Sequence, residues 1–239
     1  MIDSTVIVAT APVPSHPSTL LISTAIRFLR HYPAMESVPI LIYCDGVHPA
    51  LQHRAEQYAQ YKQNLKDLNL PNVRILESDT HIHQCNVMRN ALEEVKTDTV
   101  LVASHGWLFW GDCEWEKLFD AMRHPDVNSI RFYIFDDIHP DHKHLFGERE
   151  MVNDVPLMKT IQFADGPAIY RTQWLKDAIQ KYVNPKNRCF NEQILWPVFH
   201  NLGWKGWDGL WIYAPERLNR NVIINERETD RTPPQHIET

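Results

Sequence analysis

The chain has 239 residues, 44% of them hydrophobic, and a formal net charge of −6. This is the composition of one globular domain, and the acidic balance argues against a dedicated nucleic-acid binder. No run approaches the ~18 apolar residues of a membrane span, the start lacks the basic region of a signal peptide, and the four cysteines include no CxxC pair, so we expect a cytoplasmic protein with reduced thiols.

The first half of the chain alternates between apolar, β-branched runs and segments with helical spacing of apolar residues. In chain order, we expect strands at 5–9, 38–44, 73–76 and 99–103, with helices at 18–32, 48–68 and 86–96 between them. This order is typical of right-handed βαβ units. It predicts an α/β fold in which a mostly parallel sheet is flanked by helices.

The second half of the chain is less regular. We expect helices at 113–123, 172–182 and 191–201, strands at 129–135, 163–170 and 211–213, and a long polar loop or flap at 136–156. The sequence contains no linker that would divide the chain. It therefore predicts a single domain over residues 1–225 and a mobile tail at 226–239.

Ligands of open α/β sheets bind at the carboxyl ends of the strands. Four of these ends carry polar residues, namely Thr10, Asp45-Gly46, Glu77-Ser78-Asp79 and Ser104-His105-Gly106. The first strand is followed by no GxGxxG, and the chain has no GxxxxGK[ST], which argues against a Rossmann dinucleotide site and a P-loop.

Several segments, in this order, resemble the GT-A glycosyltransferases, and in particular their family 2-like group. The segments are VATAP at 8–12, ILIYCDG at 40–46, NVMRNALEEVKTDTVLV at 86–102, FADGPAIYRTQWL at 163–175 and FNEQILWPVFHNLG at 190–203. The resemblance covers most of residues 4–213. It implies a nucleotide-sugar donor, bound at the carboxyl edge of the sheet.

The sequence departs from this family at one motif. Where the family has Asp-x-Asp, which holds a divalent metal against the donor diphosphate, this chain has Ser104-His105-Gly106. Three interpretations remain open: metal-independent donor binding, a softer metal site with His105 as a ligand, or an inactive relative. A Ser104 nucleophile is disfavoured, because adjacent side chains on a strand point to opposite faces.

The resemblance implies a role for each candidate residue. Asp45 would contact the donor base, although Asp-Gly is also an ordinary turn. Glu192 would be the catalytic base, although a glutamate in a first helical turn also favours the helix dipole. Asp165 is the rival base or an acceptor ligand. The donor-binding candidates are Thr10, Asp45, Arg89, Ser104, His105, Arg217 and Arg220, and the last two are the arginines expected to neutralise a diphosphate.

The histidines admit a second interpretation. His139, His142 and His144 lie near Asp136, Asp137 and Asp141, a set that could hold a metal but is more typical of a solvated loop. His81 and His83 lie close to the predicted ligand edge and could touch the donor.

The function predicted from these observations is an inverting transfer of a sugar from a nucleotide-sugar donor. The metal, Mn²⁺ or Mg²⁺, is predicted to be dispensable. The acceptor is open between a glycan, a lipid-linked saccharide, a protein and a modified nucleic-acid base. The alternatives are a non-catalytic nucleotide- or glycan-binding module with this fold and a nucleotidyltransferase, whose usual glycine-rich basic signature is absent from the start of the chain.

Overall fold

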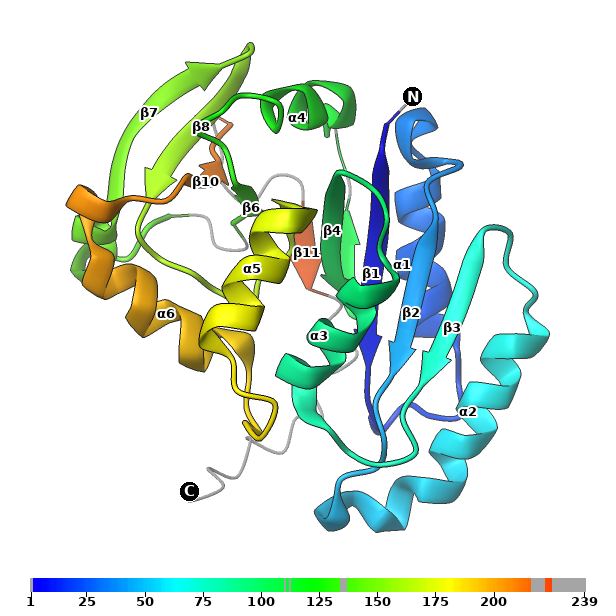
Figure 1. The fold of residues 1–239 in the computed structure, drawn as a ribbon. Helices are drawn as coiled ribbons and strands as arrows, with labels where there is room; N and C mark the ends of the chain where they lie inside the picture. The colour runs from blue at the N-terminus through cyan, green and yellow to red at the C-terminus, as the bar shows by residue number, and fades with distance from the viewer. Residues whose placement is uncertain (1, 110, 112, 134–136, 216–221, 225–239) are drawn as a thin grey trace.

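The computed structural model describes residues 2–109, 111, 113–133, 137–215 and 222–224. These residues form a central sheet with helices on both of its faces (Figure 1). The strands are β1 (Ser4–Thr10), β2 (Ile40–Cys44), β3 (Val73–Glu77), β4 (Thr99–Ser104), β5 (Trp107–Phe109), β6 (Ser129–Phe132), β7 (Phe146–Val152), β8 (Val155–Thr160), β9 (Ala168–Arg171), β10 (Leu210–Tyr213) and β11 (Val222–Ile224). The α-helices are α1 (Leu20–Arg30), α2 (Ala55–Asp67), α3 (His83–Glu94), α4 (Trp115–Ala121), α5 (Thr172–Tyr182) and α6 (Asn191–Leu202), and the 3₁₀ helices are η1 (Pro33–Met35), η2 (Pro49–Arg54), η3 (Pro140–Leu145) and η4 (Trp204–Gly206).

Two hydrophobic cores lie on opposite faces of this sheet. Along β1, Val6 and Val8 point into one core and Ile7 into the other, as the alternation of a strand requires. Helices α1, α2 and α4 cover the first core, and α3, α5 and α6 cover the second. Burial on both faces explains why the strand sequences are continuous apolar runs rather than alternating ones.

The sheet has the order β3-β2-β1-β4-β9-β6-β10-β8-β7. Strands β3, β2, β1 and β4 are parallel, as are β6 and β10, whereas β9 runs antiparallel to both β4 and β6. The predicted fold class, a mostly parallel sheet flanked by helices, is confirmed. The parallel register pairs Thr10 with Cys44, Cys44 with Glu77 and Ala9 with Ser104, so four strands end at one edge.

The prediction of a polar loop or flap over 136–156 is wrong for the part that the structure describes. Strands β7 and β8 form an antiparallel hairpin there, after the short helix η3. Asn153 and Asp154 make its turn with φ of 47° and 62°, the conformation that the tight turns of hairpins need. The polar sequence of β7 belongs to an exposed edge strand, which resembles a loop in composition.

Two further expectations differ from the structure in extent. The strand expected at 163–170 is limited to β9, and strand β11 pairs with β5 in a small second sheet that the sequence did not predict. The predicted tail at 226–239 lies outside the described residues. None of the helices in the described ranges has the length and apolarity needed to cross a membrane.

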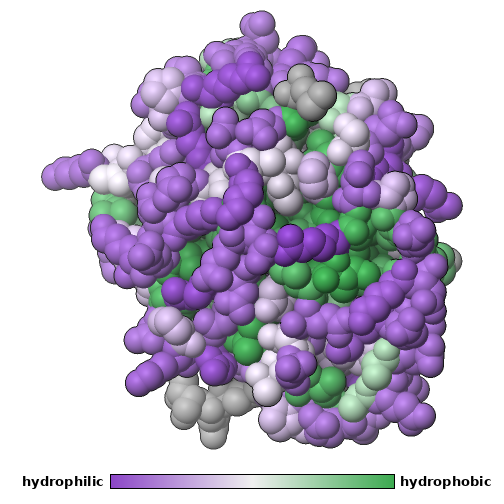
Figure 2. Space-filling model, turned by 45° about the vertical axis from the view of Figure 1, so that its right-hand side comes forward, coloured by the Kyte–Doolittle hydropathy of each residue, from purple (hydrophilic) through white to green (hydrophobic). Residues whose placement is uncertain are grey.

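Charged side chains line the exposed edge at β3. Glu77 pairs with Lys62 at 2.8 Å and with Lys66 at 2.5 Å, and Arg74 pairs with Glu94. Figure 2, which brings this side of the molecule forward, shows a mostly hydrophilic face with smaller hydrophobic areas. Charges on an edge strand oppose pairing with another chain.

Trp115 offers a test of the first core. Its side chain is 1% exposed and packs against Phe109 and Phe132 at ring distances of 5.1 and 5.5 Å. We expect Trp115→Ala to lower the free energy of unfolding by ~3–5 kcal/mol, because it removes a large buried ring and leaves a cavity. Trp204→Ala is the control, since Trp204 is 44% exposed. Equal losses for the two variants in urea unfolding would contradict this assignment of the core.

Candidate functional site

The carboxyl edge of the parallel strands gathers the residues that the sequence placed there. Thr10 ends β1, Asp45 follows β2, and Ser104 ends β4. Thr10 and Asp45 are joined directly, because the Asp45 N–H donates to the Thr10 carbonyl at 3.0 Å. The prediction that these residues share one edge is confirmed by their positions, while their contact with a donor stays a prediction.

Asp45 is 5% exposed and its carboxylate is fully engaged. Oδ1 accepts hydrogen bonds from the backbone N–H groups of Gly46 and Ile82, and Oδ2 accepts from His83 N–H at 3.1 Å. Nδ1 of His81 lies 2.8 Å from the same Oδ2. The carboxylate therefore connects the loop after β2 to the loop after β3, and a nucleotide base would have to displace one of these four partners.

Thr10 and His105 lie deeper in the edge. Thr10 is 3% exposed, and its carbonyl also accepts a hydrogen bond from the Tyr58 hydroxyl at 3.2 Å. His105 is 7% exposed, with Nδ1 at 3.4 Å from the Ala9 carbonyl. Ser104 is half-buried beside it.

Arg89 has a different environment from the one predicted. Its guanidinium donates to the backbone carbonyl of Val183, the residue that caps the C-terminus of α5. A cation at this position suits both the unpaired carbonyl and the helix dipole. The contact accounts for Arg89 structurally, and its predicted donor role stays a prediction. Arg217 and Arg220 lie outside the described residues.

The two predicted catalytic carboxyl groups lie side by side. Glu192 N–H donates to Asp165 Oδ2 at 3.0 Å, and Asp165 N–H donates to Glu192 Oε2 at 3.1 Å. Both line a cavity of about 530 Å³ together with Phe190, Gln193, Trp196 and Pro197. Glu192 thus lines a cavity that also presents two aromatic side chains, Phe190 and Trp196.

The surroundings of this pair change the pKa of Asp165. Burial and, to a smaller extent, the nearby charge of Glu192 raise the pKa of Asp165 to about 7, against the opposing effect of hydrogen bonds from Glu192 N–H and Gln84. Arg131, which is 7% exposed, lies close enough to Glu192 for that charge to raise the pKa of the guanidinium, although burial lowers it more. Asp165 therefore has a pKa at which a carboxyl group both accepts and releases a proton near neutrality.

Gln84 links this pair to the edge described above, and sequence reasoning missed it. Gln84 is the second residue of α3, and its Oε1 accepts from the Asn191 N–H at 3.0 Å. Its side chain also hydrogen-bonds Asp165. The start of α3, the start of α6 and the loop before β9 therefore form one continuous surface.

Among the described residues, one group of three or more possible metal ligands comes together, and it consists of His48, His81 and His83. His48 was not singled out by the sequence, because it follows a different strand from the other two. Its signal is that two loops at adjacent parallel strands each carry histidines. The histidine loop of η3 brings His139 and His142 to a ring distance of 5.6 Å without forming such a group among the residues described.

A larger cavity, of about 1070 Å³, lies at the opposite edge of the sheet. Ser4 at the start of β1 and Thr99 at the start of β4 line it, with Arg171 at the end of the antiparallel β9. Ligands of this architecture bind at the carboxyl edge. We therefore place the candidate site at the smaller cavity and the loops beside it.

No protein-family model matches the chain, and no curated protein sequence matches it. Solved structures do match in fold. S. aureus TarS 1–349 has a TM-score of 0.59 and 12% identity, over 95% of this chain and 62% of that one. GalNAc-T7 with UDP, GalNAc and Mn²⁺ has a TM-score of 0.59 and 9% identity, over 94% and 44%.

A mannosyltransferase from Pyrobaculum calidifontis, in complex with GDP-Man and Mn²⁺, has a TM-score of 0.52 and 11% identity, over 90% of this chain and 57% of that one. The chain therefore spans about two fifths to three fifths of the length of these proteins. At 9–12% identity these likenesses establish the fold, which is that of the GT-A glycosyltransferases.

Two of these neighbours were solved with Mn²⁺, which raises the question of whether the end of β4 fits a metal of that kind. Ser104, His105 and Gly106 supply no carboxylate there, and neither β4 nor β5 contains an aspartate or glutamate. Mg²⁺ and Mn²⁺ prefer oxygen ligands, chiefly carboxylates. The described residues at this position do not fit such an ion.

The raised pKa of Asp165 predicts a pH dependence of stability. The folded chain keeps this proton at pH values where the unfolded chain, with the ordinary aspartate value of 3.8, has lost it. The contribution of Asp165 to the free energy of unfolding therefore falls as the pH rises from about 4 to about 7, by at most ~4 kcal/mol.

Urea unfolding at several pH values tests this. Asp165→Asn removes the titrating group, so the variant should lack this decline, while Asp177→Asn, an exposed change on α5, should keep it. The assignment is wrong if wild type and Asp165→Asn share one pH profile.

Proposed function

We propose that this chain transfers a sugar from a nucleotide-sugar donor to a hydroxyl acceptor, with inversion at the anomeric carbon. The observation that carries the proposal is the reciprocal pair of Asp165 and Glu192 at the rim of a cavity, on a GT-A fold. An inverting transfer needs one carboxylate, close to the acceptor, to take its proton as the new bond forms.

Glu192 is the proposed base. The Asp165 N–H holds its Oε2, and the same cavity presents Trp196, whose ring can stack on a sugar face. Asp165 is the proposed partner that positions Glu192 through the return hydrogen bond. Because its pKa lies near 7, it is also the residue to which the role of base would pass if Glu192 proves dispensable.

The donor is proposed to lie along the carboxyl edge, near Thr10, Asp45, Ser104 and His105. TarS was solved in complex with UDP-GlcNAc and the mannosyltransferase with GDP-Man, which supports a nucleotide sugar as the donor class. The sugar and the base stay open. Since the end of β4 offers no carboxylate for a metal, Arg217 and Arg220 are proposed to neutralise the diphosphate.

Glu192→Gln tests the catalytic proposal. We expect turnover of the best donor in a nucleotide-sugar panel to fall by ~10²-fold or more, with donor affinity nearly unchanged, because the amide cannot accept the proton. Initial rates and donor calorimetry measure the two effects. The control is Glu56→Gln, which changes an exposed glutamate in the first turn of α2, so that a mere helix-dipole effect would appear in both variants.

The outcomes of this experiment separate the candidates. A Glu192→Gln variant that keeps most of its activity while Asp165→Asn loses it would move the base to Asp165. Saturable donor binding with no transfer to any acceptor in the wild type would favour the non-catalytic binding module.

Metal removal tests the donor site separately. We expect donor binding to persist in excess EDTA and to fall sharply in Arg217→Ala or Arg220→Ala, since a guanidinium pairs with two phosphate oxygens at once. Calorimetry with and without EDTA measures this. Loss of binding in EDTA, with rescue by Mn²⁺ that His105→Ala abolishes, would show instead that His105 is a metal ligand.

A further inference from the structure

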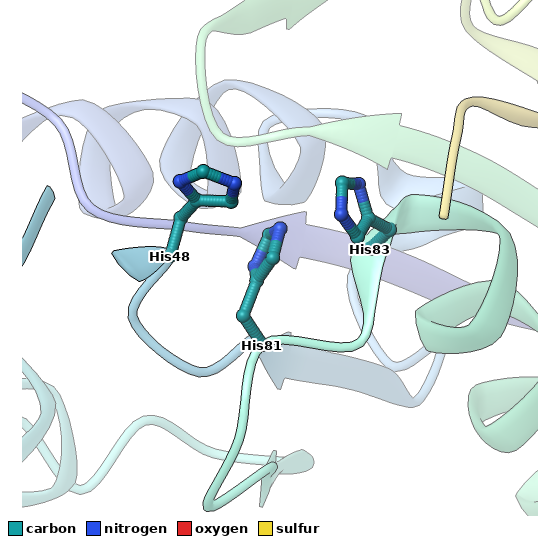
Figure 3. Close-up of side chains that lie close together, drawn as sticks. All are labelled: His48, His81 and His83. Atoms are coloured by element: carbon teal, nitrogen blue, oxygen red, sulfur yellow. The ribbon is translucent and has the colours of Figure 1, made fainter. Parts of the chain in front are cut away.

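Three histidines from two loops meet at the carboxyl edge of β2 and β3. His48 comes from the loop between β2 and η2, His81 comes from the connection between β3 and α3, and His83 is the first residue of α3. Figure 3 shows the three imidazole rings gathered above the end of the sheet. One ring nitrogen from each histidine lies within 4.8 Å of the other two, and all three residues are half-buried.

The rings are packed closely enough to act on one ion. The ring centres of His81 and His83 are 4.1 Å apart, those of His48 and His81 are 4.8 Å apart, and those of His48 and His83 are 6.0 Å apart. Zinc–imidazole bonds are ~2.0–2.1 Å long, so nitrogens about one metal lie somewhat closer than the present spacing. Small side-chain rotations would close the remaining gap.

Asp45 orients this group from beneath. Its Oδ2 lies 2.8 Å from Nδ1 of His81, which places the ring proton on Nδ1 and leaves the Nε2 lone pair for a ligand. A carboxylate behind a metal-binding histidine is the usual second layer of such sites. The structure therefore already holds His81 in the tautomer that a metal requires.

The backbone is constrained to bring His83 to the same point. His83 has a φ of 66°, in the left-handed region that residues with a side chain seldom adopt, and its N–H is held by Asp45. Strain of this kind persists where the surroundings enforce it, and it collects at functional positions.

Gly46 permits the two loops to touch. A Cβ on Gly46 would lie 2.2 Å from the Thr80 carbonyl carbon and 2.5 Å from the His81 nitrogen, so no other residue fits without moving the backbone. The close approach of the loops sets the spacing between His48 and the other two histidines.

We propose that His48, His81 and His83 form a binding site for a borderline divalent cation, with Zn²⁺ as the best fit. Three neutral imidazoles suit Zn²⁺, Ni²⁺, Co²⁺ and Cu²⁺, and they are poor ligands for Mg²⁺ and Ca²⁺, which require oxygen. Three protein ligands leave one position of a tetrahedral ion open to water or a substrate group. The proposed sugar transfer does not require this ion, and the proposed cation site does not depend on the sugar transfer.

A backbone hydrogen bond weakens His48 as a metal ligand. His48 Nδ1 accepts a hydrogen bond from the Ala50 N–H at 3.1 Å, which His48 must give up if it is to coordinate a metal through either nitrogen. His48 is therefore the weakest of the three ligands.

A cluster of histidines could instead bind an anion, but that requires the rings to be protonated. Three imidazolium groups at these distances would repel one another. Neutral rings bind metals rather than phosphate. The observations therefore favour a cation, and inorganic phosphate becomes a probe in the test.

Calorimetric titration of the full chain tests the proposal. After EDTA treatment and desalting, the chain should bind Zn²⁺ with a stoichiometry of one, and Mg²⁺ should give no heat. His81→Ala and His83→Ala should abolish this binding, and His48→Ala should weaken it less. Asp45→Asn should weaken it by about 10–100-fold. An amide N–H in place of Oδ2 would donate to Nδ1 of His81, so that the ring proton would lie on Nε2 and block the metal.

The matched control is the double variant His139→Ala/His142→Ala, which removes two exposed histidines from η3 and should leave Zn²⁺ binding unchanged. Circular dichroism confirms that each variant is folded. Asp45 and the histidines also support two loops, so the wild-type chain is measured as well. Its Co²⁺ complex should show the visible absorption of a tetrahedral site. X-ray absorption at the zinc edge should show three nitrogen neighbours of the metal.

Each other result overturns the proposal. No saturable Zn²⁺ binding by the wild type would remove the site. Binding retained in His81→Ala/His83→Ala, or lost in the control, would place the metal elsewhere. Saturable binding of inorganic phosphate that disappears in His81→Ala, with no zinc binding, would make the cluster an anion site.

Discussion

The carboxylate of Asp45 is the group on which the carboxyl edge of this sheet depends. It is buried, and a buried charge is tolerated only when it is paired and hydrogen-bonded. Here three backbone N–H groups and the His81 ring meet that need. The contacts with His81, Ile82 and His83 tie the loop after β2 to the start of α3. The burial of this carboxylate and the joining of the two loops therefore depend on the same interactions.

The second carboxyl group that shapes the site is Asp165, which has different neighbours from those of Asp45. Asp45 accepts four donors, whereas the half-buried Asp165 accepts from Glu192 N–H and Gln84 beside a second carboxyl group. Its pKa is raised to about 7, chiefly by burial. Two aspartates at one sheet edge are thus assigned to different tasks by their surroundings. The start of α3 connects the two aspartates. Its first residue, His83, donates its N–H to Asp45, and its second, Gln84, hydrogen-bonds Asp165.

In this chain, the fold does not determine which possible metal ligands lie at the end of each strand. Two solved structures with the same fold carry Mn²⁺, yet the end of β4 here has Ser104 and His105 and no carboxylate. Imidazoles gather two and three strands away, beyond the ends of β2 and β3. Soft nitrogen ligands in place of hard oxygen ligands, at a different position on the edge, would select a different cation for a different purpose.

The sequence by itself determined the parallel half of the fold, because buried strands and amphipathic helices have local periodicities that a single sequence displays. It also placed Thr10, Asp45 and Ser104 at one edge and named Glu192 and Asp165. It failed at the β7–β8 hairpin, whose exposed edge strand has the composition of a loop. Only the tertiary structure decided that Arg89 caps α5, that Asp45 is already saturated and that His48 joins His81 and His83. These outcomes depend on side-chain contacts between residues distant in sequence, which no local pattern records.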